Sequence, residues 1–505
     1  MAELRVGEGQ QYRTLAAAAG AARPGDIIVV HQGVYRETLR PPAGTTWQAE
    51  PGAVIDGGWD GGAMRPEAGN DRGVLISARG VTLRGFEIRN VAGNGIAVGA
   101  GGDECLIERC EVHDTLDGAL SANGTGTTIR GITVRGCHFH DISLSGQWYE
   151  TPVNGCFLFK GCEDVEIEDN ITERGHGEGG AFGTRSKRLT MRRCVFRRMT
   201  HLLFYVSNRA QDVLVEDSIF YQLAGEKEFR QDDGDVGQGL VIGDELSERS
   251  VNWQHGEDIV VRRCLVVNAG SGLSIRNQIK TVHGKPDGYD TTVQRLLVEN
   301  CTFVTGNNSK AGVGIQENER PGKSVKATFR KNLFIVDRLG QGGVALRNNA
   351  AGVKFEMNAW SVVPDGVGPS NAEIAASALV APFAEEFDIN NYRPRADGPL
   401  ATAGLGALGP DGPNPPPPPP PPPGDGPDWD ALLNRAATVG ALLATMGAAG
   451  NAAREHLAAA GAELAIMSLA HEDAVDDLAA LLTLLEEYRL VAAKLALLLR
   501  VGLRA

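Results

Sequence analysis

The chain has 505 residues, which is too long for one ordinary globular core, so two domains or a repeat architecture are expected. Its 42% hydrophobic content excludes a disordered chain, and 65 glycines suit a fold with many tight turns. The net charge of −14 gives no indication of a nucleic-acid partner, and no window is apolar enough to predict a membrane span.

The N-terminal residues predict a short cap. Met1–Arg5 shows no basic stretch followed by an apolar run, so no signal peptide is predicted. Gln11–Ala22 predicts an amphipathic helix that ends at Arg23-Pro24-Gly25-Asp26, before a strand at Ile27–Val30. Such a helix can cover the open end of a repeat structure.

A short pattern then recurs, in which apolar residues alternate around a small or polar marker residue. The markers, with Phe86 in the first equivalent place, are Cys110, Cys137, Asn170, Cys194, Ser218, Cys264, Cys301, Asn332 and Asn358. Three of the nine successive spacings are 24 residues, and the others are 24 plus an insertion. Each match, such as Leu106–Val112, reads as a strand, and a repeat of about 24 residues fits one coil of a parallel β-solenoid.

Two further features of the repeat predict its interior. Aromatic residues two positions after the marker predict a stacked core file of Phe139, Phe196, Phe220, Phe303, Phe334 and Trp360. Five of the eight cysteines occupy the marker position, where Asn or Ser can replace them. We therefore expect buried, reduced thiols, because no Cys-x-x-Cys pair suggests a metal site.

The two ends of this region resemble a known superfamily. The segment AARPGDIIVVHQGVYRETL looks like the entry of the pectate-lyase-like β-helix superfamily, and NNYRPRADGPLATAGLGALGP resembles its exit segment. The resemblance implies an all-β right-handed parallel β-helix over residues 1–410. It does not specify an activity, because lyases, hydrolases, epimerases and phage tailspikes share this scaffold.

The longest insertions predict loops that wall a groove along one face of the solenoid. They run over residues 143–153, 225–257 and 280–292. Trp148 and Tyr149 lie in the first of them, where exposed rings suit stacking on sugar faces or anchoring of the loop.

A basic row is the sharpest catalytic candidate. Lys160, Arg185 and Arg209 each precede a marker by nine or ten residues, so adjacent coils should place them about 4.8 Å apart. The segment NGCFLFKGCEDVEIEDNITERGHGEGGAFGTRSKRL is similar to the active-site coils of the chondroitinase B and alginate lyase family. The resemblance implies Lys160 as the base and Arg185 as the assisting acid in β-elimination from a uronate. The alternative is that both are exposed turn residues.

This chain departs from that family at two places. Val153-Asn154-Gly155 stands where the family has calcium-binding carboxylates, and Ser186-Lys187 follows Arg185 where the family has His-Gly. A separate acidic cluster, Asp232, Asp233 and Asp235, is a candidate Ca²⁺ site. With Asp244, the same cluster could instead supply a glycosidase acid/base pair.

Histidines and one further arginine complete the candidate substrate-binding residues. Gly175-His176-Gly177 resembles the histidine element of polygalacturonases, but the reversed order of the Asp pair and the missing Asn-x-Asp element exclude that activity. His138 and His140 lie one coil after His113, and His113 and His140 should point outward. They are interpreted as a surface pair, a general base or metal ligands. Arg276 is the remaining substrate-binding candidate.

The C-terminal part is expected to form a separate unit. Residues 411–427 contain nine consecutive prolines, Pro415–Pro423, which predict a polyproline II spacer or, alternatively, an SH3-type ligand. Residues 428–505 are rich in Ala and Leu at helical spacing and predict a small all-α domain. Two or three helices of this size make a marginal core, so homo-oligomerisation or docking to a partner protein is expected; the alternative is a self-contained bundle.

The sequence is compatible with three functions. The first is binding and β-elimination cleavage of an acidic extracellular polysaccharide. The second is a non-catalytic glycan-binding adhesin or phage-type spike, and the third is a glycoside hydrolase. An extracellular or virion-associated location is favoured, and the sequence fixes neither the substrate nor the oligomeric state.

Overall fold

The chain is described by a computed structural model that places most of the residues before 409. The described residues are 1–60, 71–124, 126–142, 155–183, 185–207, 210–222, 237–244, 256–277, 281–282, 285–286, 293–305, 311–317, 325–336, 344–348, 352–364, 367–383, 387–395, 400 and 405–408. The polyproline segment and the expected helical domain at 428–505 lie outside them. No helix of the described part is long and apolar enough to cross a membrane.

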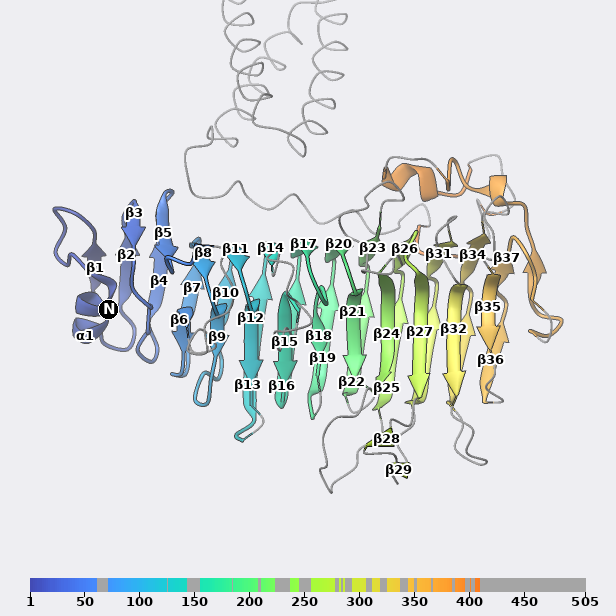
Figure 1. Cartoon of the computed structure of the whole chain (residues 1–505), viewed down its shortest axis with the longest axis horizontal. Helices are drawn as coiled ribbons and strands as arrows, with labels where there is room; N and C mark the ends of the chain where they lie inside the picture. Colours follow the sequence, from blue (N-terminus) through green and yellow to red (C-terminus); the bar gives the residue numbers. More distant parts are fainter. Residues whose placement is uncertain are drawn as a thin grey trace, which may run out of the picture. The chain divides into compact units, whose positions relative to one another are not determined.

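Three parallel sheets run side by side along the solenoid, and each coil between β6 and β35 contributes one strand to every sheet (Figure 1). Sheet A contains β1 (Glu3–Val6), β2 (Ile27–Val30), β4 (Thr46–Ala49), β7 (Thr82–Arg84), β10 (Leu106–Glu108), β13 (Ile129–Arg135), β16 (Cys162–Glu168), β19 (Lys187–Arg192), β22 (Gln211–Glu216), β25 (Gly256–Arg262), β30 (Val293–Glu299), β33 (Ala327–Arg330) and β36 (Val353–Glu356). Sheet B contains β3 (Gly33–Tyr35), β5 (Ala53–Asp56), β8 (Glu87–Val91), β11 (Glu111–Thr115), β14 (His138–Ile142), β17 (Ile171–Gly175), β20 (Val195–Met199), β23 (Ile219–Tyr221), β26 (Leu265–Val267), β31 (Thr302–Thr305), β34 (Leu333–Val336), β37 (Ala359–Trp360) and β38 (Ala372–Glu373). Sheet C contains β6 (Arg72–Ile76), β9 (Asn94–Val98), β12 (Gly118–Asn123), β15 (Phe157–Lys160), β18 (Ala181–Phe182), β21 (Leu202–Ser207), β24 (Gln238–Asp244), β27 (Ser271–Asn277), β32 (Ala311–Glu317) and β35 (Val344–Asn348).

The remaining elements are short. An antiparallel pair, β28 (Thr281–Val282) and β29 (Lys285–Pro286), lies outside the three sheets. The helix α1 (Leu15–Ala21) lies at the N-terminal end, and two 3₁₀ turns, η3 (Ala376–Ala378) and η4 (Ile389–Tyr392), follow the last strands. The structure therefore confirms the parallel solenoid expected from the 24-residue repeat.

The N-terminal helix is shorter than expected. It begins after Thr14, whose hydroxyl accepts a hydrogen bond from the backbone N–H of Ala17 at 3.1 Å, as an N-cap does. Tyr12 instead forms a parallel bridge with Val6, so the residues before Thr14 belong to the first coil and not to the helix. Residues Leu15 and Ala18 of α1 are buried, which agrees with a capping role.

The repeat motif was expected to form one strand and forms two. Leu106–Val112 is divided between β10 of sheet A and β11 of sheet B, and the chain turns sharply just before the marker. The turn residue has a positive φ in successive coils, for example 52° at Arg109 and 53° at Arg193. A single residue in the left-handed region redirects the chain and leaves the alternation of buried side chains intact.

The markers form a buried ladder at this corner. The side chain of one marker accepts a hydrogen bond from the backbone N–H of the marker one coil before. Asn170 Oδ1 accepts from Cys137 N at 2.8 Å, and Ser218 Oγ accepts from Cys194 N at 3.1 Å. Asn332 Oδ1 accepts in the same way from Cys301 N at 2.9 Å. The ladder therefore satisfies backbone donors that the corner would otherwise leave unpaired in the core.

The interior agrees with the expected aromatic file and free thiols. Phe196 and Phe220 stack with ring centroids 5.3 Å apart, and Phe334 stacks on Trp360 at 3.9 Å. Thr172 and Val266 interrupt the file in two coils. All eight cysteines are buried and free, and burial raises the pKa of Cys194 to about 12. The thiols are therefore inert core residues.

The outer face of sheet B changes character along the solenoid. Its C-terminal half is apolar and forms a second buried cluster with the chain that follows β38. Leu379, Tyr392, Leu400 and Leu408 of this covering segment (residues 374–408) are almost fully buried. Figure 1 shows its first part in orange over the last strands. The N-terminal half of the same face is charged, and it carries one of the two sites described next.

Candidate functional site

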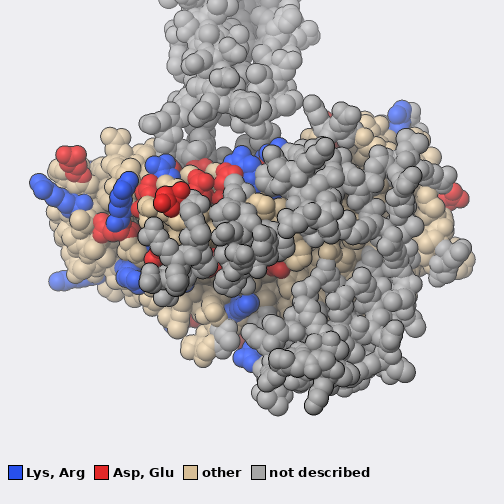
Figure 2. Space-filling view, in the orientation of Figure 1, with Lys and Arg blue, Asp and Glu red and all other residues tan. Residues whose placement is uncertain are grey.

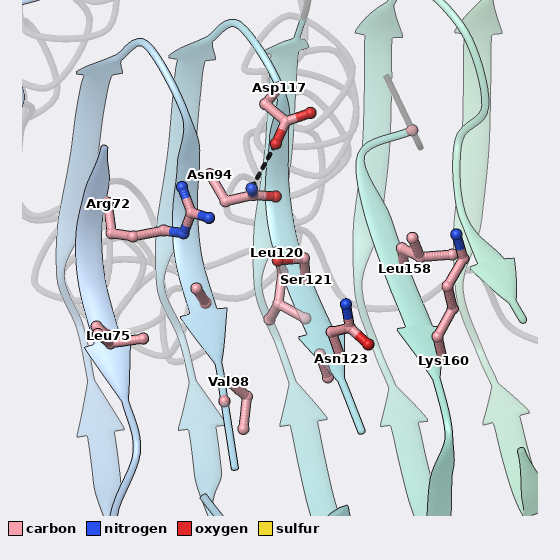
Figure 3. Close-up of a pocket in the computed structure, with 14 residues that line it drawn as sticks. Arg72, Leu75, Asn94, Val98, Asp117, Leu120, Ser121, Asn123, Leu158 and Lys160 are labelled. Atoms are coloured by element: carbon pink, nitrogen blue, oxygen red, sulfur yellow. Dashed lines mark hydrogen bonds between the residues drawn. The ribbon is translucent and has the colours of Figure 1, made fainter. Parts of the chain in front are cut away.

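A pocket of about 300 Å³ opens on the outer face of sheet C (Figure 3). Four neighbouring strands build it, because β6, β9, β12 and β15 pair in parallel register and bring equivalent residues together. Apolar side chains, Leu75, Val98, Leu120 and Leu158, line part of its wall. Its polar lining is Arg72, Asn94, Asp117, Ser121, Asn123 and Lys160.

Asp117 is the acidic group of the pocket. Its Oδ2 accepts a hydrogen bond from Asn94 Nδ2 at 2.7 Å, whereas its Oδ1 is buried and has no hydrogen-bond partner among the described residues. Figure 3 shows Arg72 directed toward Asn94 and Asp117. Burial raises the pKa of the Asp117 carboxyl, although the Asn94 bond and the Arg72 charge act in the opposite direction. The pocket therefore holds a carboxyl group that keeps its proton to higher pH than an ordinary Asp.

Lys160 ends β15 and is half-buried in the same pocket. It pairs with Asn123 on the preceding coil. On the following coil it lies against Gly183, where a Cβ would meet Lys160 Cγ at 2.7 Å. Arg185 comes two residues later, after β18 has ended, with a φ of 62° and an exposed side chain. The residue beside Lys160 is thus Gly183, and Arg185 has the exposed turn position that the sequence left as the alternative.

The other residues expected near Lys160 are only partly described. Arg276 lies in β27, in the register row that continues from Gly183 through Ser207 and Gly243. Asp244 is the last residue of β24, one position beyond that row. Four coil steps separate the Lys160 and Arg276 strands, which is about 19 Å. Outside the described residues lie Arg209, Trp148, Tyr149, Asp232, Asp233 and Asp235.

The predicted histidines lie on sheet B, away from the sheet C pocket. His113 and His140 are register partners in β11 and β14, and their rings stack 4.8 Å apart. His138 lies 4.3 Å from the His140 ring. The expected outward stack on two coils is confirmed, but the rings are mostly buried among charged neighbours. His176 follows β17 directly, in the turn that leaves sheet B.

Each histidine of this cluster contacts carboxylates on both sides of its ring. His140 Nε2 lies 3.0 Å from Glu111 Oε1, and its Nδ1 lies 2.6 Å from Asp141 Oδ2. His138 Nε2 lies 2.9 Å from Glu173 Oε1, and its Nδ1 lies 3.9 Å from Glu111 Oε1. Arginines hold the outer carboxylates: Arg197 bonds Glu173 at 2.6 Å, and Arg174 pairs with Asp141.

The two histidines therefore titrate differently. Burial lowers the pKa of His138 despite its bond to Glu173. Burial acts in the same direction on His140, but Asp141 and Glu111 overcome it and raise its pKa to about 9. Figure 2 shows acidic and basic side chains gathered at the upper edge of the described surface, over the N-terminal half of the solenoid.

Sequence reasoning missed several members of both sites. Glu111 occupies the same position after its marker as His138, and Glu173 the same position as His140, so counting from the marker could have found them. Asp117 and Arg72 give no such signal. The positions of Asp117 and Arg72 depend on the register of sheet C. Turns of varying length lie between the marker and the strands of this sheet, so counting from the marker does not find them.

Strand order, register and corner geometry define a right-handed parallel β-helix protein. Residues 72–226 match the family described as the right handed beta helix region, and this span contains the whole pocket on sheet C. No curated protein matches the chain in sequence.

Solved structures match the chain at low identity and with TM-scores below 0.5. The structure of XylC with xylose has 11% identity and a TM-score of 0.46, with coverage of 76% of this chain and 86% of that one. The PL6 family alginate lyase AlyGC has 14% identity and a TM-score of 0.47. The match covers 80% of this chain and 56% of that lyase. The pectate lyase Pel9A has 13% identity and a TM-score of 0.44, covering 81% of this chain and 96% of that one.

Proposed function

We propose that the pocket on sheet C binds a uronate unit of an acidic polysaccharide and cleaves the chain there by β-elimination. The observation that carries this proposal is the joint presence of Lys160, Arg72 and a proton-retaining Asp117 in one pocket. Perturbed titratable groups that converge in a cleft are typical of functional sites.

The lining suits an acidic sugar. Two cationic side chains and a single carboxyl group, whose pKa is raised, line the pocket, so the pocket has positive charge to offer a carboxylate. Asn94, Ser121 and Asn123 supply hydrogen-bonding groups for hydroxyls. The apolar side chains of Leu120 and Leu158 can pack against the face of a sugar ring.

The reaction divides among three groups. Lys160 takes the proton from C5 of the uronate, as the base that the sequence resemblance implies, and Arg72, three coils away in the same pocket, pairs with the carboxylate of a neighbouring unit. The electron pair of that C–H bond forms the C4–C5 double bond, and the bond from C4 to the glycosidic oxygen breaks. The leaving oxygen takes its proton from Arg185, on the following coil, which is the acid that the sequence resemblance implies. Asp117 lies six residues before Asn123, the register partner of Lys160, so it is too far along the strand for that role and serves to bind a neighbouring unit of the polymer.

The alternative functions make different demands on the pocket. A glycosidase of the usual kind needs two carboxyl groups across the scissile bond, and Asp117 is the single carboxyl group among the described lining residues. A non-catalytic adhesin or spike would use the same cationic and polar lining for binding alone. Binding and cleavage must therefore be measured separately.

The test compares the full-length protein with its Lys160→Ala variant on alginate, pectate and glycosaminoglycans. We expect the native protein to generate the ultraviolet absorbance of an unsaturated uronate, and the variant to lose it. The free energy of unfolding should change by no more than about 1 kcal/mol, because the Lys160 side chain is half-exposed. Lys354→Ala, an exposed lysine on sheet A, is the matched control and should keep full activity.

Binding of the corresponding oligosaccharides is measured by calorimetry on the same proteins. Binding without any new absorbance would leave the uronate site in place and replace the lyase by an adhesin. Absence of binding to every uronate, or binding that Lys160→Ala and Asp117→Asn leave unchanged, would refute the proposal.

A further inference from the structure

We propose that Glu111, His138 and His140 form a binding site for one divalent transition-metal ion of the Zn²⁺ class on the outer face of sheet B. The ligand atoms would be a Glu111 carboxylate oxygen, His138 Nδ1 and His140 Nε2. This site is separate from the sheet C pocket and does not depend on the function proposed for that pocket.

The three donor atoms have the spacing that a small metal ion requires. One ligand atom from each residue lies within 4.8 Å of the others. Glu111 Oε1 lies 3.0 Å from His140 Nε2 and 3.9 Å from His138 Nδ1. Ligand atoms bound tetrahedrally at 2.0–2.1 Å lie about 3.4 Å apart, so side-chain adjustments of at most about 1.4 Å bring the three donors to that spacing.

The backbone fixes the three ligands independently of any ion. Glu111 and His138 are register partners on adjacent strands, and His140 follows His138 on the same face of β14. In a parallel sheet this arrangement holds side chains about one strand spacing apart. Since these strands are central in sheet B, the site rests on a rigid part of the solenoid.

The ring nitrogens that do not face the site are already oriented. His138 Nε2 contacts Glu173, which Arg197 holds, and His140 Nδ1 contacts Asp141, which Arg174 holds. A carboxylate on the second ring nitrogen is the usual outer partner of a metal-bound histidine. Here both histidines have such a partner.

Donor chemistry selects the class of metal. Two imidazoles and one carboxylate suit Zn²⁺ and its neighbours, whereas Ca²⁺ takes six to eight oxygen ligands. The three ligand side chains are exposed by 11–19%, so a fourth position can take water or another ligand. Among the described residues, this is the one group of His, Cys, Asp and Glu side chains with metal-binding spacing.

The experiment measures Zn²⁺ binding to the full-length, chelator-treated protein by calorimetry, with Co²⁺ absorbance as a report on coordination geometry. We expect one ion per chain at this site, tetrahedral Co²⁺ bands, and no displacement by Ca²⁺. Glu111→Gln, His138→Ala and His140→Ala should each abolish the Co²⁺ bands and weaken the binding at least 100-fold. Glu173→Gln should weaken it about 10-fold, because it removes an outer partner.

His113→Ala is the matched control, since His113 stacks on His140 but supplies no ligand atom. It should keep the Co²⁺ bands. Circular dichroism confirms that each variant is folded, and the near-isosteric Glu111→Gln decides the result if an alanine variant unfolds. The assignment fails if Zn²⁺ does not bind, if binding persists unchanged in folded Glu111→Gln, or if His113→Ala abolishes it.

Discussion

At the scale of single residues, Asp117 is the side chain of the sheet C pocket that has a raised pKa. The carboxyl is buried, one oxygen has no hydrogen-bond partner among the described residues, and its pKa is raised. The charge of Arg72, in the same pocket, favours the ionised form of this carboxyl, but burial outweighs it and the carboxyl keeps its proton to higher pH than usual. Ionisation of such a carboxyl lowers the free energy of unfolding, and this decrease can be measured.

Replacing Asp117 by Asn should change how stability depends on pH. A raised folded-state pKa means that the folded protein binds the proton more tightly than the unfolded chain. The native free energy of unfolding therefore falls as pH rises from about 4, the unfolded pKa, through the folded pKa. Asp117→Asn removes this decline, so urea unfolding over a pH series should show its stability rising relative to the native protein.

Asp56 provides a control of opposite sign. Burial alone would raise its pKa, but hydrogen bonds from Gly58, Asn90 and Arg89 hold the pKa of Asp56 below the usual value. Its contribution is present above the unfolded pKa and is lost as pH falls through the folded one. Asp56→Asn should thus lower stability at neutral pH.

Parallel pH profiles for the Asp117→Asn and native proteins would contradict the assignment for Asp117.

Counting residues from the marker predicted which side chains are neighbours on sheet B, but it did not predict the neighbours on sheet C. His113 and His140 were placed on one outward file, because both lie three residues after a marker and the corner between sheets A and B has a constant length. Lys160 and Arg185 were counted backward across a second corner, and the structure puts Gly183 beside Lys160 instead. Turns of different length enter and leave sheet C, so a fixed offset from the marker does not hold there.

At the scale of elements, the corner between sheets A and B is the repeating unit of the fold. The alternation of apolar residues continues through it, which is why the sequence suggested one strand in place of two. The turn residue is glycine in two coils, at Gly85 and Gly136, but an ordinary polar residue in many others, such as Arg109, Asp169 or Asn300, so glycine does not mark the corner consistently. The period is visible in the sequence, but the bend is not.

The marker ladder at this corner should contribute measurably to stability. Asn332 is fully buried, accepts from Cys301 N at 2.9 Å and donates to Val298 O at 2.9 Å. Asn332→Ala leaves both backbone groups unpaired and opens a cavity, so we expect a loss of about 3 kcal/mol in the free energy of unfolding. Chemical denaturation measures it.

Cys264→Ser is the matched control for the ladder. Ser occupies the equivalent position at Ser218, where its hydroxyl accepts from the preceding marker and donates to a carbonyl. We expect that change to cost no more than about 1 kcal/mol. A loss below about 0.5 kcal/mol for Asn332→Ala would mean that the ladder only accompanies the corner and does not stabilise it.

At the scale of the whole molecule, the covering segment 374–408 closes the apolar half of sheet B. Leu265, Val267, Val304 and Ile335 point outward from their strands and are nevertheless buried, because this segment packs on them. The outer face of sheet B is therefore apolar where this segment packs on it, whereas the part near Glu111, outside this cluster, is charged. The sequence resemblance predicts that the β-helix ends near residue 410, and the last described residues, Ala407 and Leu408, still belong to this buried cluster.

We propose that residues 428–505 serve association with another chain, because Leu490–Leu503 is almost wholly aliphatic in sequence. The described part of the covering segment reaches Leu408, so a chain truncated after residue 410 keeps every described residue of the β-helix and of its cover. Deleting residues 411–505 should therefore leave a folded protein with an altered oligomeric state or lost docking. Multi-angle light scattering and circular dichroism on full-length and truncated protein measure both properties.

A second truncation separates the two roles of the C-terminal part. Ending the chain at residue 373 also removes the covering segment and exposes the apolar face around Val267 and Ile335. That protein should aggregate or bind a hydrophobic dye, whereas the chain ending at residue 410 should not. Equal monomeric masses for the full-length and 410-residue proteins would exclude self-association. Aggregation of the 410-residue protein itself would show instead that residues 411–505 protect the β-helix.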